Sequence, residues 1–362
     1  MLLTVSINGD GYHPAGWRAP GRSEQSIAAD LRSITALAES GGFVAALFGL
    51  PAFDSAARAS GRVPIVHPDA LPVVSSLVAV TKTIGLAAAY TLDRAEPHNI
   101  ARSFATLDRL SVGRSAWIIE LRGDGDHGRE AECIEVVRKL WDSWDDDAFV
   151  ADQAKGRVAD SDKVRRINHT GAHFTVRGPL NVPRPNQGHP VLLMTDPGDA
   201  AGRTIVSDVA DILLVDCADG EAARAIRDVA RAAASRSRNP DAPKVMMNVF
   251  PILGATEAEA RRTEAELNRL AGAALSARTP GLKFVGMPEQ LCRRLTELHA
   301  AGTCDGFNIL PPVLPGDLKL FVDQVIPLLR RNNLIPAQWP GRTLRERMGL
   351  PHPRSRYAKE PA

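Results

Sequence analysis

The chain has 362 residues, of which 44% are hydrophobic and 24% charged, which is enough for a sizeable core in one large domain or two ordinary ones. The formal net charge of +2 excludes the strong basic excess of nucleic-acid-binding proteins. No apolar run approaches the roughly 18 residues that span a bilayer, so we expect no membrane segment.

The cysteines and the N-terminal residues bear on the compartment. Residues 1–17 contain no basic segment followed by a long apolar run, so we expect no signal peptide. The four cysteines lie far apart, without a CxxC pattern or a Cys/His cluster. This spacing predicts free, mostly buried thiols, no metal site and a cytoplasmic location, where thiols stay reduced.

Short apolar runs alternate with longer helical patterns along the chain. The helical patterns are clearest at residues 23–40, 129–144 and 317–331. Repeated strand-then-helix units predict a parallel sheet with helices outside it, and eight units in this length predict a (β/α)8 TIM barrel. The eight predicted strands are LLTVSIN (2–8), VAALFG (44–49), IGLAAAY (84–90), SAWIIEL (115–121), VLLMT (191–195), ILLVD (212–216), KVMMNVF (244–250) and GFNIL (306–310).

We expect a single barrel domain over residues 1–335 and a C-terminal extension over 336–362. This extension is rich in Pro and Arg, and we expect it to wrap the surface or a partner subunit. Residues 146–190 are more polar and are interpreted as an excursion between units four and five. Within it, a glycine and β-branched residues predict a hairpin over 166–183, which disfavours a helical metal site at His169 and His173.

The loop after the fourth predicted strand contains a G-x-G-x-x-G pattern at Gly123, Gly125 and Gly128. Such glycines bind pyrophosphate in dinucleotide-binding folds. Here Asp124 and Asp126 would repel a phosphate, and the strand is not the first of a nucleotide-binding half. We therefore interpret the pattern as a tight loop between a strand and a helix.

Polar side chains follow the predicted strands at their carboxyl ends, where barrel enzymes carry their active sites. Two are histidines, His13 and His98, which suit proton transfer near neutral pH and are predicted to be catalytic. For each, a hydrogen-bonded bystander is the alternative. The other polar residues at these ends are Asn8, Asp10, Thr91, Asn99, Glu120, Arg122, Thr195, Asp196, Asp216 and Asn308.

Residues 96–117, EPHNIARSFATLDRLSVGRSAW, resemble a signature of the bacterial-luciferase-like flavin monooxygenases. The branch contains nitrilotriacetate monooxygenase, pristinamycin synthase and dibenzothiophene-sulfone monooxygenase. The resemblance implies a luciferase-type barrel, either a homodimer or a heterodimer with a second luciferase-like chain. It also implies a separate flavin reductase that supplies reduced FMN, with which O2 oxidises a small-molecule substrate. Further matching blocks lie at 11–18, 135–150, 167–193, 284–331 and 341–351.

The resemblance also suggests which residues hold the cofactor, but several family positions differ. Ile118, Leu121 and Arg122 stand where relatives have an Asn and a Thr-Ser pair, and the histidine of the third loop is displaced or lost. Asp199 stands near the place of a serine. The predicted cofactor-binding residues are Asn99, Trp117, Gly198, Gly202, Arg203 and Asn308.

Asp199 has a direct physical consequence. A carboxylate that caps the helix beginning at Ala200 accepts the backbone N–H groups that a flavin phosphate would use, and it repels the phosphate. Two segments also look shortened: the fourth strand-to-helix loop and the stretch between the seventh strand and residue 283. The second segment lacks the long helical insertion that covers the active site in relatives, and a missing cover weakens the monooxygenase hypothesis, because the oxygenated flavin must be shielded from water.

Three functions remain open from the sequence. The first is a monooxygenase that uses reduced FMN through rearranged contacts. The second is a barrel that has lost its flavin and serves as a partner subunit. The third is an enzyme independent of flavin, with acid–base chemistry at the polar rim, including Glu120 and Arg122.

Overall fold

The computed structural model describes residues 1–19, 27–50, 68–92, 95–121, 127–234, 243–272 and 281–357. Eight parallel strands in this part of the chain form a closed barrel, because β10 pairs with both β9 and β11. The predicted (β/α)8 barrel is confirmed, and each predicted run falls on one barrel strand. The strands are β1 (Leu2–Ile7), β2 (Ala45–Phe48), β3 (Gly85–Ala89), β4 (Ser115–Ile119), β9 (Val191–Thr195), β10 (Ile212–Val215), β11 (Lys244–Leu253) and β13 (Gly306–Ile309).

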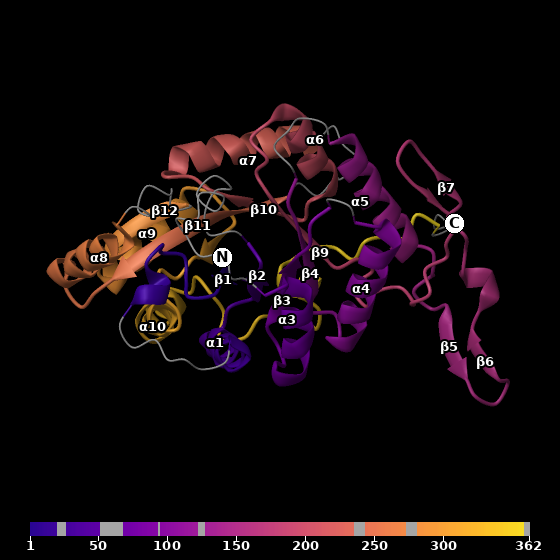
Figure 1. Ribbon diagram of the computed structural model, residues 1–362, viewed down its shortest axis with the longest axis horizontal. Helices are drawn as coiled ribbons and strands as arrows, with labels where there is room; N and C mark the ends of the chain where they lie inside the picture. The colour runs from indigo at the N-terminus through magenta and orange to yellow at the C-terminus, as the bar shows by residue number, and fades with distance from the viewer. Residues whose placement is uncertain are drawn as a thin grey trace.

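Helices surround the strands (Figure 1). The three clearest helical patterns are confirmed, as α1, as α5, and as α10 with α11, which are joined by a π-helical segment (Phe321–Val325). The helices are α1 (Ile27–Gly41), α3 (Ala70–Leu77), α4 (Pro97–Leu110), α5 (Gly128–Trp141), α6 (Ala200–Val209), α7 (Gly220–Ala234), α8 (Glu257–Ala271), α9 (Pro288–Ala300), α10 (Gly316–Leu320) and α11 (Ile326–Arg331).

The strands bury both faces, as parallel strands do. Along β1, Leu3 and Val5 belong to the large core between the sheet and the helices. Leu2 belongs to a second core inside the barrel, and Thr4 also points inward, since its hydroxyl donates to Asn308 on β13. The period of two along each strand therefore separates an outer packing layer from an inner layer that can carry polar groups.

One strand was not predicted from the sequence. β12 (Leu282–Gly286) pairs in parallel with the second half of β11, from Val249 to Leu253. The first half of β11 pairs with β13 in the barrel. With ten residues, β11 is long enough to leave the barrel and carry this extra strand.

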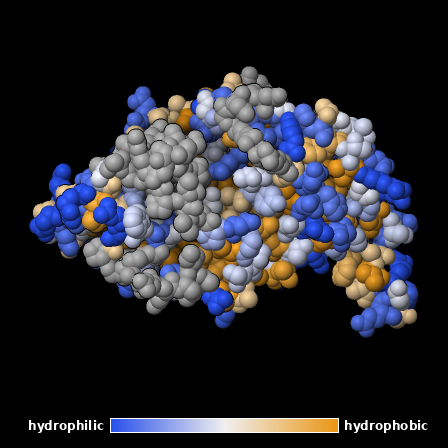
Figure 2. Space-filling model, viewed as in Figure 1, coloured by the Kyte–Doolittle hydropathy of each residue, from blue (hydrophilic) through white to orange (hydrophobic). Residues whose placement is uncertain are grey.

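Two hairpins form the excursion over residues 146–190. The predicted hairpin is confirmed as β7 (His169–Thr170) with β8 (Thr175–Val176), and the imidazole of His169 lies 3.0 Å from the Glu132 carboxylate of α5. The other hairpin, β5 (Phe149–Asp152) with β6 (Arg157–Ala159), projects from the body (Figure 1). It exposes Phe149, Val150 and Val158. Figure 2 shows apolar surface at the end of the molecule where this hairpin lies.

The chain after residue 335 closes the amino-terminal end of the barrel. Leu344 of α12 (Leu344–Arg347) and Met348 are buried in the core inside the barrel. The Leu344 amide donates to the carbonyl of Gly113, at 2.7 Å, and Arg345 holds both carboxylate oxygens of Asp211 at 2.6 and 2.7 Å. The segment expected as an extension therefore shares the inner core of the barrel.

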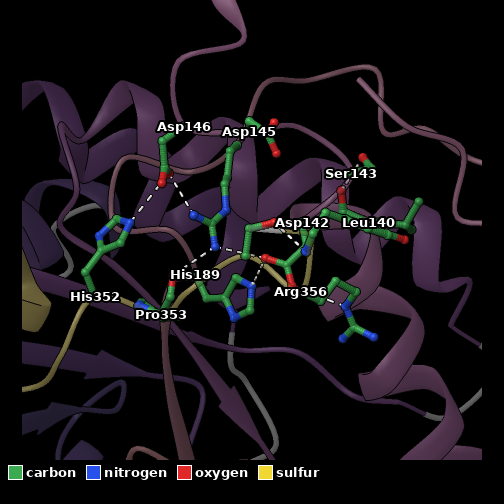
Figure 3. Close-up of polar contacts among 12 residues, drawn as sticks. Leu140, Asp142, Ser143, Asp145, Asp146, His189, His352, Pro353 and Arg356 are labelled. Atoms are coloured by element: carbon green, nitrogen blue, oxygen red, sulfur yellow. Dashed lines mark hydrogen bonds and ion pairs between the residues drawn. The ribbon is translucent and has the colours of Figure 1, made fainter. Parts of the chain in front are cut away.

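A buried ion cluster fastens the excursion and the tail to this same end (Figure 3). The Asp142 carboxylate, at the end of α5, lies 2.8 Å from His189 and 2.9 Å from Arg184, and 3.3 Å from Arg356 of the tail. Arg184 also donates to the carbonyl of Pro353 at 2.9 Å. Burial alone would raise the pKa of Asp142, but its cationic partners outweigh burial and hold this pKa well below the usual range.

Three further expectations concern the thiols, the membrane and the glycine loop. All four cysteines are free and buried, as predicted. Of the helices in the described ranges, none combines the length and the apolar character needed to cross a membrane. In the G-x-G-x-x-G pattern, Gly123 and Gly125 lie outside the described residues, and Gly128 is the first residue of α5.

Replacing Leu344 by Ala tests the closure of the barrel by the tail. Because this side chain is fully buried, we expect Leu344→Ala to lower the free energy of unfolding by about 2–5 kcal/mol, measured by urea titration. Leu110→Ala, at an exposed position at the end of α4, is the matched control and should have little effect. Equal stability of the two variants would show that the tail does not contribute to the barrel core.

Replacing Asp142 by Asn tests the ion cluster. We expect Asp142→Asn to cost about 3 kcal/mol at pH 7, because Arg184 and Arg356 lose their buried counter-charge. Since folding lowers the pKa of Asp142, its contribution is present above the usual aspartate pKa and is lost as the pH falls through the folded value. The difference in the free energy of unfolding between wild type and Asp142→Asn should therefore become smaller as the pH falls. Asp162→Asn, at an exposed position, serves as the control.

Candidate active site

The loop after β1 is held at the carboxyl end of the barrel by the loop after β13. The amides of Tyr12 and His13 donate to the carbonyls of Pro311 and Pro312, at 2.8 and 2.9 Å. Gly11 has a φ of +112°, and a Cβ there would lie 2.3 Å from the Pro312 oxygen, so this approach requires glycine. The Gly-Tyr-His sequence thus sets two titratable side chains where active sites of this fold lie.

A hydrogen-bonded network of polar side chains lies inside the barrel. Asn308 is fully buried, and its Oδ1 accepts from the Thr4 hydroxyl at 2.9 Å. Its Nδ2 donates to Ser6 at 2.9 Å and to Asn248 Oδ1 at 2.7 Å. Asn248 in turn donates to Asp216, just after β10, at 2.7 Å. The network therefore links the barrel interior to the carboxyl end and fixes the orientation of both amides.

Two further side chains at this end are buried and polar. Asn8 is 4% exposed, and its Nδ2 has no hydrogen-bond partner among the described residues. An unpaired buried donor costs about 1–3 kcal/mol, so Asn8 is a donor in place for a ligand oxygen. Burial raises the pKa of Tyr12, and the nearby Asp216 and Glu120 add to this effect. Tyr12 therefore keeps its hydroxyl proton across the physiological range.

His13 is a neutral histidine in this environment. Its Nδ1 accepts the amide proton of Ala15 at 3.1 Å, which places the ring proton on Nε2, 3.4 Å from the side-chain oxygen of Asn268. Burial lowers the pKa of His13, and the hydrogen bond to Asn268 offsets part of that effect. Near pH 7 the ring can donate a hydrogen bond from Nε2, while the imidazolium is disfavoured.

The N-terminus of α6 is capped by the side chain of Asp199. Its Oδ1 accepts the Gly202 amide at 2.8 Å, and its Oδ2 lies 3.2 Å from His127 Nε2. The other ring nitrogen of His127 lies 2.8 Å from the Glu130 carboxylate. The contact with Glu130 and then that with Asp199 raise the pKa of His127 against its burial. The predicted cap is present, and a histidine whose protonated form is favoured by two carboxylates is bound to it.

Gly198 and Arg203 lie in the same loop-and-helix segment as this cap. Arg203 binds both oxygens of Asp196, with Nε and Nη2 at 2.9 and 3.0 Å. Gly198 has a φ of +84° and donates to Asp196 at 3.3 Å, so it shapes the turn before the helix. Both residues are near the end of β9, as expected, but the Arg203 guanidinium already has a carboxylate partner.

Three further predicted residues lie on α4 and β4. His98 is half-buried and Asn99 exposed in the first turn of α4. Trp117 is fully buried in the outer layer, where its indole packs against Phe104 of α4 and Trp141 of α5. The inward positions of β4 are those of its neighbours Ala116 and Ile118, and the cofactor contact expected for Trp117 stays a prediction.

A cavity of about 520 Å³ lies at the opposite, amino-terminal end. Its lining includes Asp142 and His189 of the ion cluster and Arg345 of the tail. Barrel enzymes of this architecture place their chemistry at the carboxyl end of the strands. We therefore assign the candidate active site to the end that carries Asn8, His13 and the Asn248–Asn308 pair.

The chain forms a closed parallel barrel, and hydrogen-bonding and titratable groups gather at the carboxyl end of its strands. These two features define the class of (β/α)8 barrel enzymes. Within this class, the model of the luciferase-like monooxygenase family matches residues 12–283, and the chain belongs to that family. The branch expected from the sequence is confirmed, since nitrilotriacetate monooxygenase component A and dibenzothiophene-sulfone monooxygenase are 29% and 30% identical to it.

Individual relatives span nearly the whole chain. N-acetyl-S-(2-succino)cysteine monooxygenase of Bacillus subtilis (strain 168) is 31% identical over 437 positions, which cover 99% of this chain and 98% of that protein. One of the subunits of pristinamycin IIA synthase from Streptomyces pristinaespiralis is 33% identical over 321 positions, covering 89% and 88%. The structure of EDTA monooxygenase from Chelativorans sp. BNC1 aligns with a TM-score of 0.83 at 26% identity, over 97% of this chain and 99% of that one.

The residues at the barrel mouth fit one part of the flavin that the family implies and not the other. Amides, hydroxyls and a neutral imidazole suit the carbonyl and N–H groups of a flavin ring, and the unpaired Asn8 amide is a free donor for it. The phosphate would require the first amides of α6. The amide of Gly202 is bonded to Asp199, so the described residues do not fit a phosphate there.

Several residues of this site were missed or undervalued from the sequence. Ser6 and Asn248 are polar residues at inward positions of otherwise apolar strands, and that pattern could have singled them out. Tyr12 and His127 carry no comparable signal. Their roles depend on the loop after β13 and on Asp199, 72 residues away from His127 in the chain, and no local pattern encodes those contacts.

The environment of His13 gives a spectroscopic prediction. We expect 1H–15N NMR to show the Nε2–H tautomer and a pKa below the ordinary value of about 6.5. Asn268→Ala should lower this pKa further, because it removes the acceptor that favours the protonated ring. The ring signals that disappear in a His13→Gln variant are those of His13. A His13 pKa above the ordinary value would contradict this description.

Proposed function

We propose that the protein is a monooxygenase that uses a reduced flavin, supplied by a separate reductase, and O2 to oxidise a small organic substrate. The observation that carries the proposal is the buried, unpaired amide of Asn8 beside the polar network at the carboxyl end of the barrel. The family match makes a flavin ring the ligand that these groups suit. The unpaired Asn8 donor would be an unexplained cost in a barrel that binds nothing.

The division of work follows from the side chains present. When bound, a reduced flavin supplies the electrons that activate O2. Asn8 would donate to a ring oxygen, and Asn248, oriented by Asn308, would hold the ring from the barrel side. His13, held neutral and directed by the Ala15 amide, would donate from Nε2 to the flavin only in exchange for its 3.4 Å contact with Asn268. His98 remains the proposed proton donor, because His13 is held neutral.

The proposal includes a partner. A relative is named as component A of nitrilotriacetate monooxygenase, which supports a system in which another component provides the reduced flavin. The substrates named for relatives, N-acetyl-S-(2-succino)cysteine, nitrilotriacetate and dibenzothiophene sulfone, are small organic molecules. We therefore propose a small-molecule substrate and an assembly as a homodimer or as a heterodimer with another luciferase-like chain.

A second candidate function is that of a partner subunit without its own turnover. The alignment with the pristinamycin IIA synthase chain covers nearly equal shares of the two proteins, so they are close in length. The alignment with the Bacillus subtilis enzyme has 437 positions, more than this chain has residues, and so contains gaps in it. The resemblance to a short synthase chain and the capped α6 terminus favour this alternative over a flavin-independent enzyme.

The monooxygenase proposal predicts oxygen transfer that depends on a flavin reductase. The protein, with NADH, flavin and a general flavin reductase, should incorporate label from 18O2 into at least one of the three named substrates, measured by mass spectrometry. Asn8→Ala should weaken flavin binding about tenfold by loss of one buried hydrogen bond. Asn332→Ala, at an exposed position, is the control. Label incorporation only after co-expression with a second luciferase-like chain would favour the function of a partner subunit.

A further inference from the structure

The first turn of α6 is capped by a carboxylate of the protein itself, that of Asp199. The Asp199 carboxylate accepts the Gly202 amide at 2.8 Å, and this amide is among those that a helix N-terminus offers to a phosphate. The hydrogen bond from Gly202, followed by that from His127, lowers the pKa of Asp199, so the group is ionised near neutral pH. A phosphate can reach this turn only by displacing a charged side chain that belongs to the protein.

The cap is fastened from the opposite side by His127, whose side chain is 2% exposed. The imidazole lies between two carboxylates, with Nδ1 2.8 Å from Glu130 and Nε2 3.2 Å from Asp199. The turn is also tightly packed, because a Cβ added to Gly202 would lie 2.6 Å from Pro197 and 3.2 Å from His127 Nε2. Displacing Asp199 would therefore leave His127 with one of its two partners and open a packed turn.

Among the described residues bonded to one another at this turn, carboxylates outnumber basic groups. The carboxylates are Glu130, Asp196 and Asp199; His127 lies between Glu130 and Asp199, and Arg203 is bound to Asp196. A flavin phosphate, with close to two negative charges, would meet this excess at short range, where the repulsion is substantial even in a partly exposed site. A neutral ribityl chain would bring hydroxyl donors, which the partly exposed Asp199 carboxylate can accept.

We propose that the barrel selects a flavin without the terminal phosphate, of the riboflavin type, over FMN, and that Asp199 is the residue that decides this. The inference rests on the proposed binding of a flavin ring at the carboxyl end. It differs from the proposed function in the chemical class of the ligand, a neutral ribityl flavin in place of a phosphorylated one. His127 is a positioning residue that holds the deciding carboxylate.

The test compares binding of two ligands that differ only in the phosphate. Oxidised riboflavin and FMN are titrated into the protein and followed by flavin fluorescence, and photoreduced forms are titrated anaerobically and followed by absorbance. We expect wild type to bind riboflavin at least about tenfold more tightly than FMN. Added salt should narrow this difference, because it screens the repulsion of the phosphate.

Two variants assign the effect to Asp199. Asp199→Ser keeps a capping side chain without the charge, and it should tighten FMN binding about tenfold. Riboflavin binding should weaken by a smaller factor, because the serine hydroxyl still accepts a hydrogen bond from the ribityl chain, but more weakly than the carboxylate. The matched control is Asp219→Ser, because Asp219 caps the next helix, α7, by accepting the Ala222 amide at 2.9 Å. This variant should leave both affinities unchanged.

The possible outcomes separate the inference from the proposed function. Binding of FMN to wild type as tightly as riboflavin overturns the inference and leaves the flavin-dependent function standing. A preference for riboflavin that persists unchanged in Asp199→Ser also overturns it, because the carboxylate is then not the cause. Saturable binding of neither flavin, in either redox state, to wild type or variant overturns both.

Discussion

Closure of the barrel is the constraint on which the other features depend. Pairing of β10 with β11 completes the ring, so all parallel strands deliver their carboxyl ends to one rim. The inner layer is apolar toward the amino-terminal end, where Leu344 and Met348 of the tail complete it. Toward the other end it becomes polar, with Asn308 bonded to groups on neighbouring strands. The amino-terminal end of the core thereby contributes mainly to stability, and the carboxyl end carries the candidate binding site.

The two ends hold their charges in different ways. At the amino-terminal end, Asp142 is bonded to Arg184 and His189 of the excursion and to Arg356 of the tail, and the cluster joins segments far apart in the chain. At the carboxyl end, Asp199 and His127 form a pair at the start of α6 that is open to solvent on the carboxylate side. The first arrangement is structural, because its buried ion pairs join the excursion and the tail to α5. The second lies at the start of α6, and in the proposed function it decides whether a phosphate can approach this helix.

Family membership and the local chemistry of the site carry different information. The family model and the barrel establish ancestry and the place of the active site. They do not determine whether each inherited contact survives, since function depends on the side chains that a given chain places at the rim. Asn8, Asn248 and Asn308 offer polar groups that suit a flavin ring. At α6, by contrast, the Asp199 side chain is bonded to the Gly202 amide, one of the amides that would bind a flavin phosphate. The site is therefore better described by its own contacts than by the family pattern.

The sequence alone determined the eight barrel strands, the hairpin at His169 and the capping role of Asp199, because each depends on contacts within a short stretch of chain: strand periodicity, turn residues and an N-cap. Only the tertiary structure decided that Trp117 faces the outer helices, that the tail fills the barrel base, and that His127 binds Asp199. These depend on which face of a strand turns inward and on segments brought together by barrel closure. Neither is encoded in local spacing.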